Sequence, residues 1–165
     1  MRKSQRNDFV WATFWAIVTA ISLVGSCLAT GSSAKKVEHL EGGYTVELPV
    51  TLSVAQGNPM PDFVLYKVNN PAGKQLLAIY LGCAPETRFK PPANAVSSST
   101  PIGGYAATSV RWSDKGETLS GTSLLELKSN GWPCVAHMIF RELSKGDADL
   151  AESVVQSFHL DQTQQ

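Results

Sequence analysis

The sequence has no excess of charge of either sign. It contains 14 Lys and Arg residues and 14 Asp and Glu residues among 165. Three of the cations and one of the acids precede the first apolar run, so the remainder carries 11 cations and 13 acids. Proteins that bind nucleic acid display clustered Lys and Arg. The mildly acidic remainder lacks that electrostatic footprint, and we expect no nucleic-acid partner.

Residues that carry chemistry are few and scattered along the chain. The histidines are His39, His137 and His159, and no two have the spacing of metal ligands. Ser97-Ser98-Ser99 lacks the Gly-x-Ser-x-Gly context of a nucleophile elbow. Cys134 lies three residues before His137 on a predicted strand, so their side chains point to opposite faces. We therefore expect no catalytic residue, metal site or cofactor, and the sequence favours a protein that is not an enzyme.

The N-terminus is the part of the chain with a recognisable purpose. Residues 1–8 are basic and polar, residues 9–24 are almost entirely apolar, and small residues follow. This three-part layout is typical of a secretory signal peptide. The run from Phe9 to Leu28 is also long enough to span a bilayer as a helix. Because Lys and Arg precede it, an uncleaved segment would leave the body outside the cytoplasm.

A short motif at the end of this segment indicates a third possibility. Leu23-Val24-Gly25-Ser26-Cys27 resembles the box of bacterial lipoproteins. That resemblance implies a lipid on Cys27 and cleavage just before it. A lipoprotein, a cleaved signal and a retained anchor all place the body outside the cytoplasmic membrane, in the periplasm or at the cell surface. We expect a membrane-attached protein with a signal or anchor over residues 1–30 and a tether over residues 31–36. A single domain over residues 37–160 and a frayed tail over residues 161–165 complete the predicted chain.

The remaining cysteines form a natural pair. If Cys27 is lipidated or removed, Cys83 and Cys134 are left in a compartment that favours disulfides. Both stand at the ends of apolar runs that adjacent strands could bring together. The sequence predicts a Cys83–Cys134 bridge, and the alternative is two buried free thiols.

Hydrophobic patterning predicts a sheet in the body. The apolar run at residues 76–81 lies between turn residues and is typical of a strand buried on both faces. Residues 62–68 are expected to pair with it as a hairpin, and residues 134–140 are expected beside it. Residues 44–48, 106–112 and 119–127 also read as strands, and residues 50–54 as an edge strand. Residues 84–100 are rich in Pro and Ser and are expected to form a long loop.

The last predicted element is an amphipathic helix. Ala151, Val154, Val155 and Phe158 fall at i, i+3, i+4 and i+7, which makes a single apolar stripe. Acidic residues precede the stripe, as is common at a helix start. The helix should cover one face of the sheet, so the sequence predicts an α+β fold with a mainly antiparallel sheet.

The order of these segments resembles a known family. Gly-Gly-Tyr-Thr-Val-Glu-Leu-Pro at residues 42–49 and Ala-Glu-Ser-Val-Val-Gln-Ser-Phe at residues 151–158 are similar to the opening and closing motifs of Mog1/PsbP-like domains. The resemblance implies an α/β/α sandwich, whose second helix would come from residues 84–95. It also implies a binding, assembly or chaperone-like role, and it transfers no functional residue.

One aromatic residue stands out as a candidate for a partner surface. Trp132 lies in a turn between Gly131 and Pro133, where it either folds over the edge of the core or anchors an interface. Phe89, in the long loop, is the second candidate. The leading hypothesis is a protein-binding envelope module. The alternatives are a small hydrolase or ligand-binding protein that uses the cleft near residues 84–100, and a purely structural protein.

Overall fold

The structure is a computed structural model that describes residues 34–58, 60–85, 91–114, 117–127 and 131–161. Four sequence predictions fall wholly or mostly outside these residues: the signal or anchor segment over residues 1–30, lipidation of Cys27, the role of Phe89 and the frayed tail over residues 161–165. The body described below lies within one compact unit, Ser33–Gln165.

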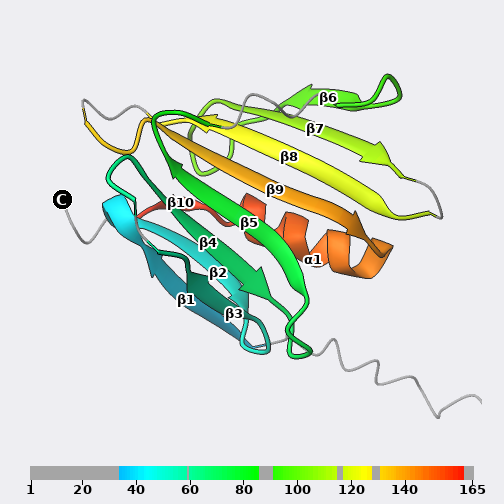
Figure 1. Cartoon of the computed structure of the whole chain (residues 1–165), viewed down its shortest axis with the longest axis horizontal. Coiled ribbons are helices and arrows are strands. Elements are labelled where there is room, and N and C mark those ends of the chain that lie inside the picture. Colours follow the sequence, from blue (N-terminus) through cyan, green and yellow to red (C-terminus); the bar gives the residue numbers. More distant parts are fainter. Residues whose placement is uncertain (1–33, 59, 86–90, 115–116, 128–130, 162–165) are drawn as a thin grey trace, which may run out of the picture. The chain divides into compact units, whose positions relative to one another are not determined.

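A seven-stranded antiparallel sheet forms the main layer, with strand order β3-β4-β5-β9-β8-β7-β6 (Figure 1). Its strands are β3 (Ser53–Gln56), β4 (Phe63–Asn69), β5 (Gln75–Gly82), β6 (Val96–Ser99), β7 (Ala107–Ser113), β8 (Leu119–Glu126) and β9 (Val135–Leu143). The predicted hairpin of β4 with β5 and the placement of β9 beside β5 are both confirmed.

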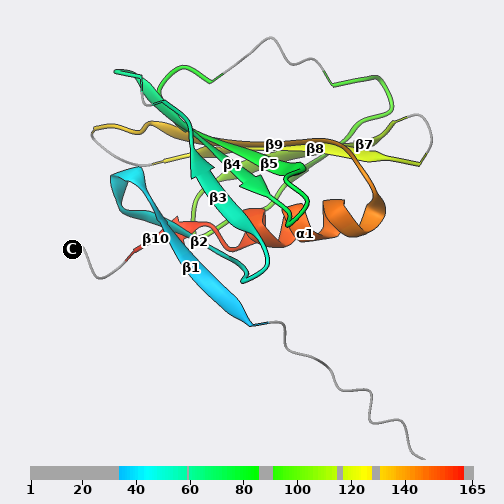
Figure 2. The same ribbon diagram turned by 60° about the horizontal axis from the view of Figure 1, so that its bottom comes forward.

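A smaller antiparallel sheet and one α-helix make the second layer. The small sheet has the order β1-β2-β10, with β1 (Lys35–Leu40), β2 (Tyr44–Pro49) and β10 (His159–Leu160). A 3-10 turn, Glu41–Gly43, joins β1 to β2. The helix α1 (Lys145–Gln156) lies with this small sheet on one side of the seven-stranded sheet (Figure 2). It packs mainly against β2, β5, β8 and β9.

The core lies between these two layers. On β5, Leu77, Ile79 and Leu81 face α1 and are fully buried. On the opposite face of β5, Ala78 and Tyr80 are only half-buried. The prediction that this strand is buried on both faces is therefore confirmed only for the face toward α1. Its other face remains partly exposed to solvent.

The helix begins where a local hydrogen bond supports it. The hydroxyl of Ser144 accepts a hydrogen bond from the backbone N–H of Asp147 at 3.2 Å, which satisfies a donor of the first turn. The predicted stripe is confirmed, because Ala151, Val154 and Val155 are buried against the sheet. Burying each valine stabilises the fold by roughly 1.5–3 kcal/mol. Phe158 belongs to the same buried stripe although it lies beyond the helix end.

Three predicted boundaries are corrected by strand pairing. The expected loop over residues 84–100 contains β6, which pairs with β7 at the sheet edge. The expected edge strand over residues 50–54 lies instead at β3, Ser53–Gln56. β1 starts at Lys35, inside the expected tether, because Lys35 and Lys36 pair with β2. Each correction concerns an edge strand, where backbone pairing decides the structure and side-chain patterning is weak.

The fold class is α+β, as predicted. Within the described ranges α1 is the only α-helix, and it covers one face of the seven-stranded sheet. Residues 91–95, at the end of the stretch proposed for a second helix, are not helical.

Candidate functional site

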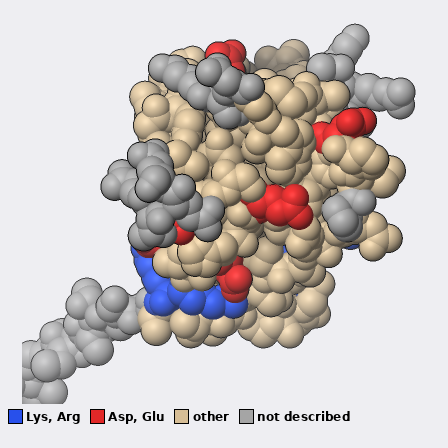
Figure 3. Space-filling view, turned by 90° about the vertical axis from the view of Figure 1, so that its left-hand side faces the viewer, with Lys and Arg blue, Asp and Glu red and all other residues tan. Residues whose placement is uncertain are grey.

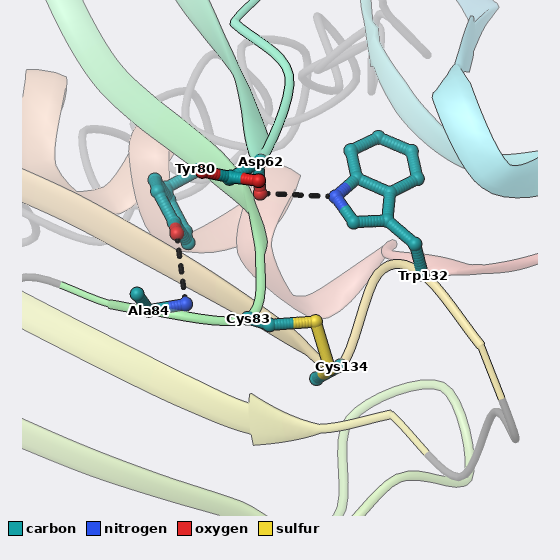
Figure 4. The surroundings of a disulfide bond; sticks show 6 residues. All are labelled: Asp62, Tyr80, Cys83, Ala84, Trp132 and Cys134. Carbon is teal, nitrogen blue, oxygen red and sulfur yellow. Dashed lines mark hydrogen bonds between the residues drawn. A yellow bond between two sulfur atoms is a disulfide. The ribbon is translucent and has the colours of Figure 1, made fainter.

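The predicted disulfide joins the ends of two neighbouring strands. Cys83 follows β5 and Cys134 precedes β9, and their sulfur atoms are 1.98 Å apart (Figure 4). The backbone N–H of Cys134 donates to the carbonyl of Gly82 at 3.2 Å, so the strand ladder reaches up to the bridge. Both half-cystines are exposed. Cys134 is thus bonded to sulfur and offers no thiol to His137.

Trp132 lies two residues before Cys134, and its indole points away from the bridge toward Asp62 (Figure 4). Its indole Nε1–H donates to the backbone carbonyl of Asp62 at 3.0 Å, and 38% of the residue stays accessible (Figure 4). Pro133 is buried on the 3-10 turn, where a Cβ on Gly42 would come within 2.8 Å of the proline Cδ. Met60, two residues before Asp62, is 56% exposed. We call Met60, Asp62, Trp132 and the disulfide the Trp132 corner.

An aromatic pair on β4 and β5 lies beside the same corner. The rings of Phe63 and Tyr80 stack with centroids 5.3 Å apart. The Tyr80 hydroxyl accepts a hydrogen bond from the backbone N–H of Ala84 at 3.1 Å, which holds the chain just after Cys83 (Figure 4). On the end of the molecule that faces the viewer in Figure 3, Asp and Glu form several separate patches, and Lys and Arg gather at the lower left. The Trp132 corner is therefore held by backbone contacts and aromatic packing.

A groove of about 480 Å³ lies between α1 and the edge of the large sheet formed by β6 and β7. Its lining residues are Asn94, Val96, Arg111, Trp112, Ser113, Leu119, Ser120, Phe140, Ala148, Asp149 and Glu152. Two of these, Asn94 and Val96, come from the stretch over residues 84–100 where the sequence placed an alternative cleft. None of the lining residues is a histidine or a cysteine.

Arg111 is the largest polar group in this groove, and all its donors are used. Its Nε and Nη2 both donate to Glu152 Oε2, at 2.8 and 2.5 Å, and Nη2 also reaches the Ser123 hydroxyl. Nη1 donates to the carbonyls of Val110 and Thr122. The guanidinium carbon lies 5.2 Å from the centre of the Phe140 ring. Arg111 therefore ties β7 to α1 and has no N–H left for an anionic ligand.

A second polar network joins two of the lining residues, Trp112 and Ser120. Asp114 accepts hydrogen bonds from the indole N–H of Trp112, at 2.9 Å, and from the hydroxyl of Ser120. The Ser120 oxygen also accepts the backbone N–H of Glu142, a residue with a positive φ of 50°. The Ser120 hydroxyl is thereby committed to fixing the strand irregularity between β8 and β9.

The structure places two histidines on either side of Thr45 in the small sheet, a relation that the sequence did not show. His39 and His159 both stand opposite Thr45 in the small sheet. His159 Nε2 lies 3.0 Å from the Thr45 hydroxyl, and His39 Nδ1 lies 3.3 Å from a carboxylate oxygen of Asp161. His39 is 67% exposed in its side chain. Sequence patterning gave no signal for this cluster, since β10 is two residues long and pairs with a strand more than a hundred residues away.

The third histidine is a buried sheet residue, as its apolar strand predicts. His137 is 7% exposed, and its Nε2 lies 2.5 Å from the hydroxyl of Thr122 on β8. In the part of the chain that the structure describes, no group of three His, Cys, Asp or Glu side chains is placed to hold a metal ion.

Burial in the core raises the pKa values of two tyrosines. Burial, with Tyr105 beside it, raises the pKa of Tyr44 to about 12. Burial also raises the pKa of Tyr66, whose hydroxyl accepts the backbone N–H of Glu41 at 2.8 Å. Tyr44 stacks on Phe158 with centroids 5.1 Å apart. The Tyr66 hydroxyl thus joins β4 of the large sheet to the 3-10 turn of the second layer.

Among the described residues, no helix has the length and apolar character needed to cross a membrane. Compared with family models, curated proteins and solved structures, the chain shows no significant match to any of them.

Proposed function

We propose that this protein is an exported, membrane-attached module that binds another protein through the Trp132 corner. The observation that carries the proposal is that Trp132 is fixed in position yet remains 38% exposed. Tryptophan is enriched among the residues that dominate binding energy at interfaces. A side chain that is already ordered loses little conformational freedom on binding, which favours affinity.

The location in this proposal rests on two features. Disulfides persist mainly in oxidising compartments, and the chain pairs Cys83 with Cys134. The N-terminal layout adds a route to the cell envelope, with Cys27 as the proposed site of lipid attachment. Mass spectrometry of the membrane fraction tests this directly. We expect an N-terminal peptide that starts at a lipid-modified Cys27, and a peptide chain uncleaved through residue 27 would contradict it.

The Mog1/PsbP-like relationship is part of the same proposal. An antiparallel sheet covered by a C-terminal helix is one part of the sandwich that the resemblance implies, and residues 151–156 of the closing motif lie in α1. The relationship would place the protein among binding, assembly or chaperone-like modules. An experimental structure with a second helix over the other face of the large sheet would support it, and a face that stays free of helix would contradict it.

The binding role can be tested at the Trp132 corner. The full-length protein is cross-linked in intact cells of its source, and the partner identified by mass spectrometry is purified for titration. We expect Trp132→Ser to weaken binding of that purified partner by at least about 30-fold, the effect of a 2 kcal/mol anchor. Leu150→Ser is the matched control, because Leu150 is equally exposed at 38% but lies on α1. Equal affinities for both variants would refute the proposal.

The alternative function is a small hydrolase or ligand-binding protein that uses the groove beside β6. The observation that favours it is the groove itself, which includes Asn94 and Val96 from the stretch where the sequence expected a cleft. Its ionisable lining groups are Arg111, Asp149 and Glu152, and Arg111 is held by Glu152. The groove therefore offers a ligand apolar contacts and a rim that carries carboxylates.

A further inference from the structure

The edge strand β6 and the groove beside it form one continuous surface. β6 is the last strand of the large sheet, and all four of its residues are exposed. Within the described part of the chain, β7 is the only strand that pairs with it. As far as the described residues go, the other edge of its backbone carries no strand and can pair with a further one.

The sequence of β6 lacks two of the usual protections against such pairing, although the strand is only four residues long. Edge strands are commonly shielded by charged side chains or by proline, and Val96-Ser97-Ser98-Ser99 contains neither. Val96 is 70% exposed and stands opposite Arg111 in the β6–β7 register. Because Arg111 reaches Glu152 on α1, Val96 also faces the helix side of the sheet, next to the groove.

The charges of the groove distinguish between possible ligands. The guanidinium of Arg111 and the carboxylate of Glu152 neutralise each other at 2.5 Å. The carboxylate that remains at the rim is that of Asp149, which is 65% exposed and has a surface pair with Lys145. An exposed pair of this kind contributes little and exchanges readily with another cation. The groove thus complements a ligand that presents one apolar group and one cation.

We propose that β6 accepts an extended peptide segment of a partner protein, which adds a strand to the sheet. Backbone hydrogen bonds to the open edge hold the segment, as in other cases of strand addition. An apolar side chain of the segment packs beside Val96 in the groove, and a Lys or Arg two residues away approaches Asp149. The spacing of two is required because alternate side chains of a strand share one face.

The peptide would occupy the groove of the alternative function, and its binding does not depend on the Trp132 corner. The two surfaces share no residue, so substitution of Val96 leaves Trp132 and its hydrogen bond to Asp62 in place. Loss of partner binding at Trp132 and loss of peptide binding at β6 are consequently separate results.

The probe is a synthetic peptide, Ser-Val-Ser-Lys-Ser-Val-Ser with blocked ends, in which valine and lysine lie on one face. It is titrated into the isotope-labelled full-length protein in nanodiscs of zwitterionic lipid, and amide chemical shifts are recorded. Two control peptides replace the lysine by glutamate or move it by one residue, which puts it on the opposite face. We expect the shifts to centre on the amides of Val96–Ser99, and both controls to bind about twofold to fivefold more weakly.

Two protein variants complete the test. Val96→Lys should lower the affinity for the probe peptide by a similar factor. Val37→Lys, at a valine that is 51% exposed on β1, should leave that affinity unchanged. The inference is overturned if the three peptides bind alike, if none binds, or if the shifts centre elsewhere. It is also overturned if the β6 amides shift with protein concentration alone, since a second copy would then be the occupant.

Discussion

Removal of the disulfide should cost this protein a large part of its stability. The bridge closes a loop with a sequence separation of 51 residues. Chain-entropy arguments give about 4 kcal/mol for a loop of this length, because the cross-link restricts the unfolded chain. Domains of this size have a total free energy of unfolding of only about 5–15 kcal/mol. The predicted loss in a Cys83→Ser/Cys134→Ser variant is therefore a quarter or more of the total.

Changes in the folded state should add little to the predicted loss of stability or subtract little from it. Both half-cystines are exposed, so replacing them removes little packing. The hydrogen bond from Cys134 to Gly82 uses backbone atoms and survives the substitution. We thus expect an unchanged native fold and an effect confined to the unfolded chain.

Urea unfolding followed by circular dichroism measures the effect. We expect the free energy of unfolding to fall by about 4 kcal/mol, the melting temperature by about 15 °C, and the urea dependence to steepen because the unfolded chain expands. Reduced wild-type protein and the single variant Cys83→Ser should match the double variant, since each lacks the same cross-link. A loss below about 1 kcal/mol with an unchanged native spectrum would refute the reasoning.

Three further predictions concern the body. Gly42→Ala should destabilise more than Gly73→Ala by at least about 1 kcal/mol in urea unfolding, because both glycines have positive φ but only Gly42 has a neighbour within 3 Å of the added Cβ. Equal losses would refute the steric argument. Phe158→Ala, at a fully buried position, should cost about 3–5 kcal/mol by the same assay, and a loss below about 1 kcal/mol would contradict its place in the core. The hydrogen bond from Lys74 lowers the pKa of Asp147, so the carboxylate stays charged in the folded protein where the unfolded chain takes up a proton. This stabilisation is complete above the unfolded value near pH 4 and is lost as pH falls through the folded-state pKa. In the wild type the free energy of unfolding falls as the pH is lowered through this range, and Lys74→Met should reduce that fall by at most about 1 kcal/mol. An identical pH dependence in both proteins would show that the pair contributes nothing.

The candidate sites were only partly predictable. Trp132 could be selected from the sequence because a large aromatic between Gly and Pro is unusual in a turn. Its contact with Asp62 could not, since a sequence separation of 70 lies between them. The groove depends on Arg111 and Glu152, and periodicity treats both as ordinary polar residues outside the apolar pattern. Their pairing becomes visible only when β7 and α1 meet.

The elements whose burial leaves a hydrophobic pattern were predictable from the chain alone. The apolar run of β5, the stripe of α1 and the two cysteines at strand ends each follow from local residue order. The tertiary structure alone decided the edge strand β6, the short strand β10 and the facing of His39 and His159 across Thr45. The physical reason is that burial selects residue type position by position, whereas an edge strand is held by backbone hydrogen bonds that nearly any residue can make.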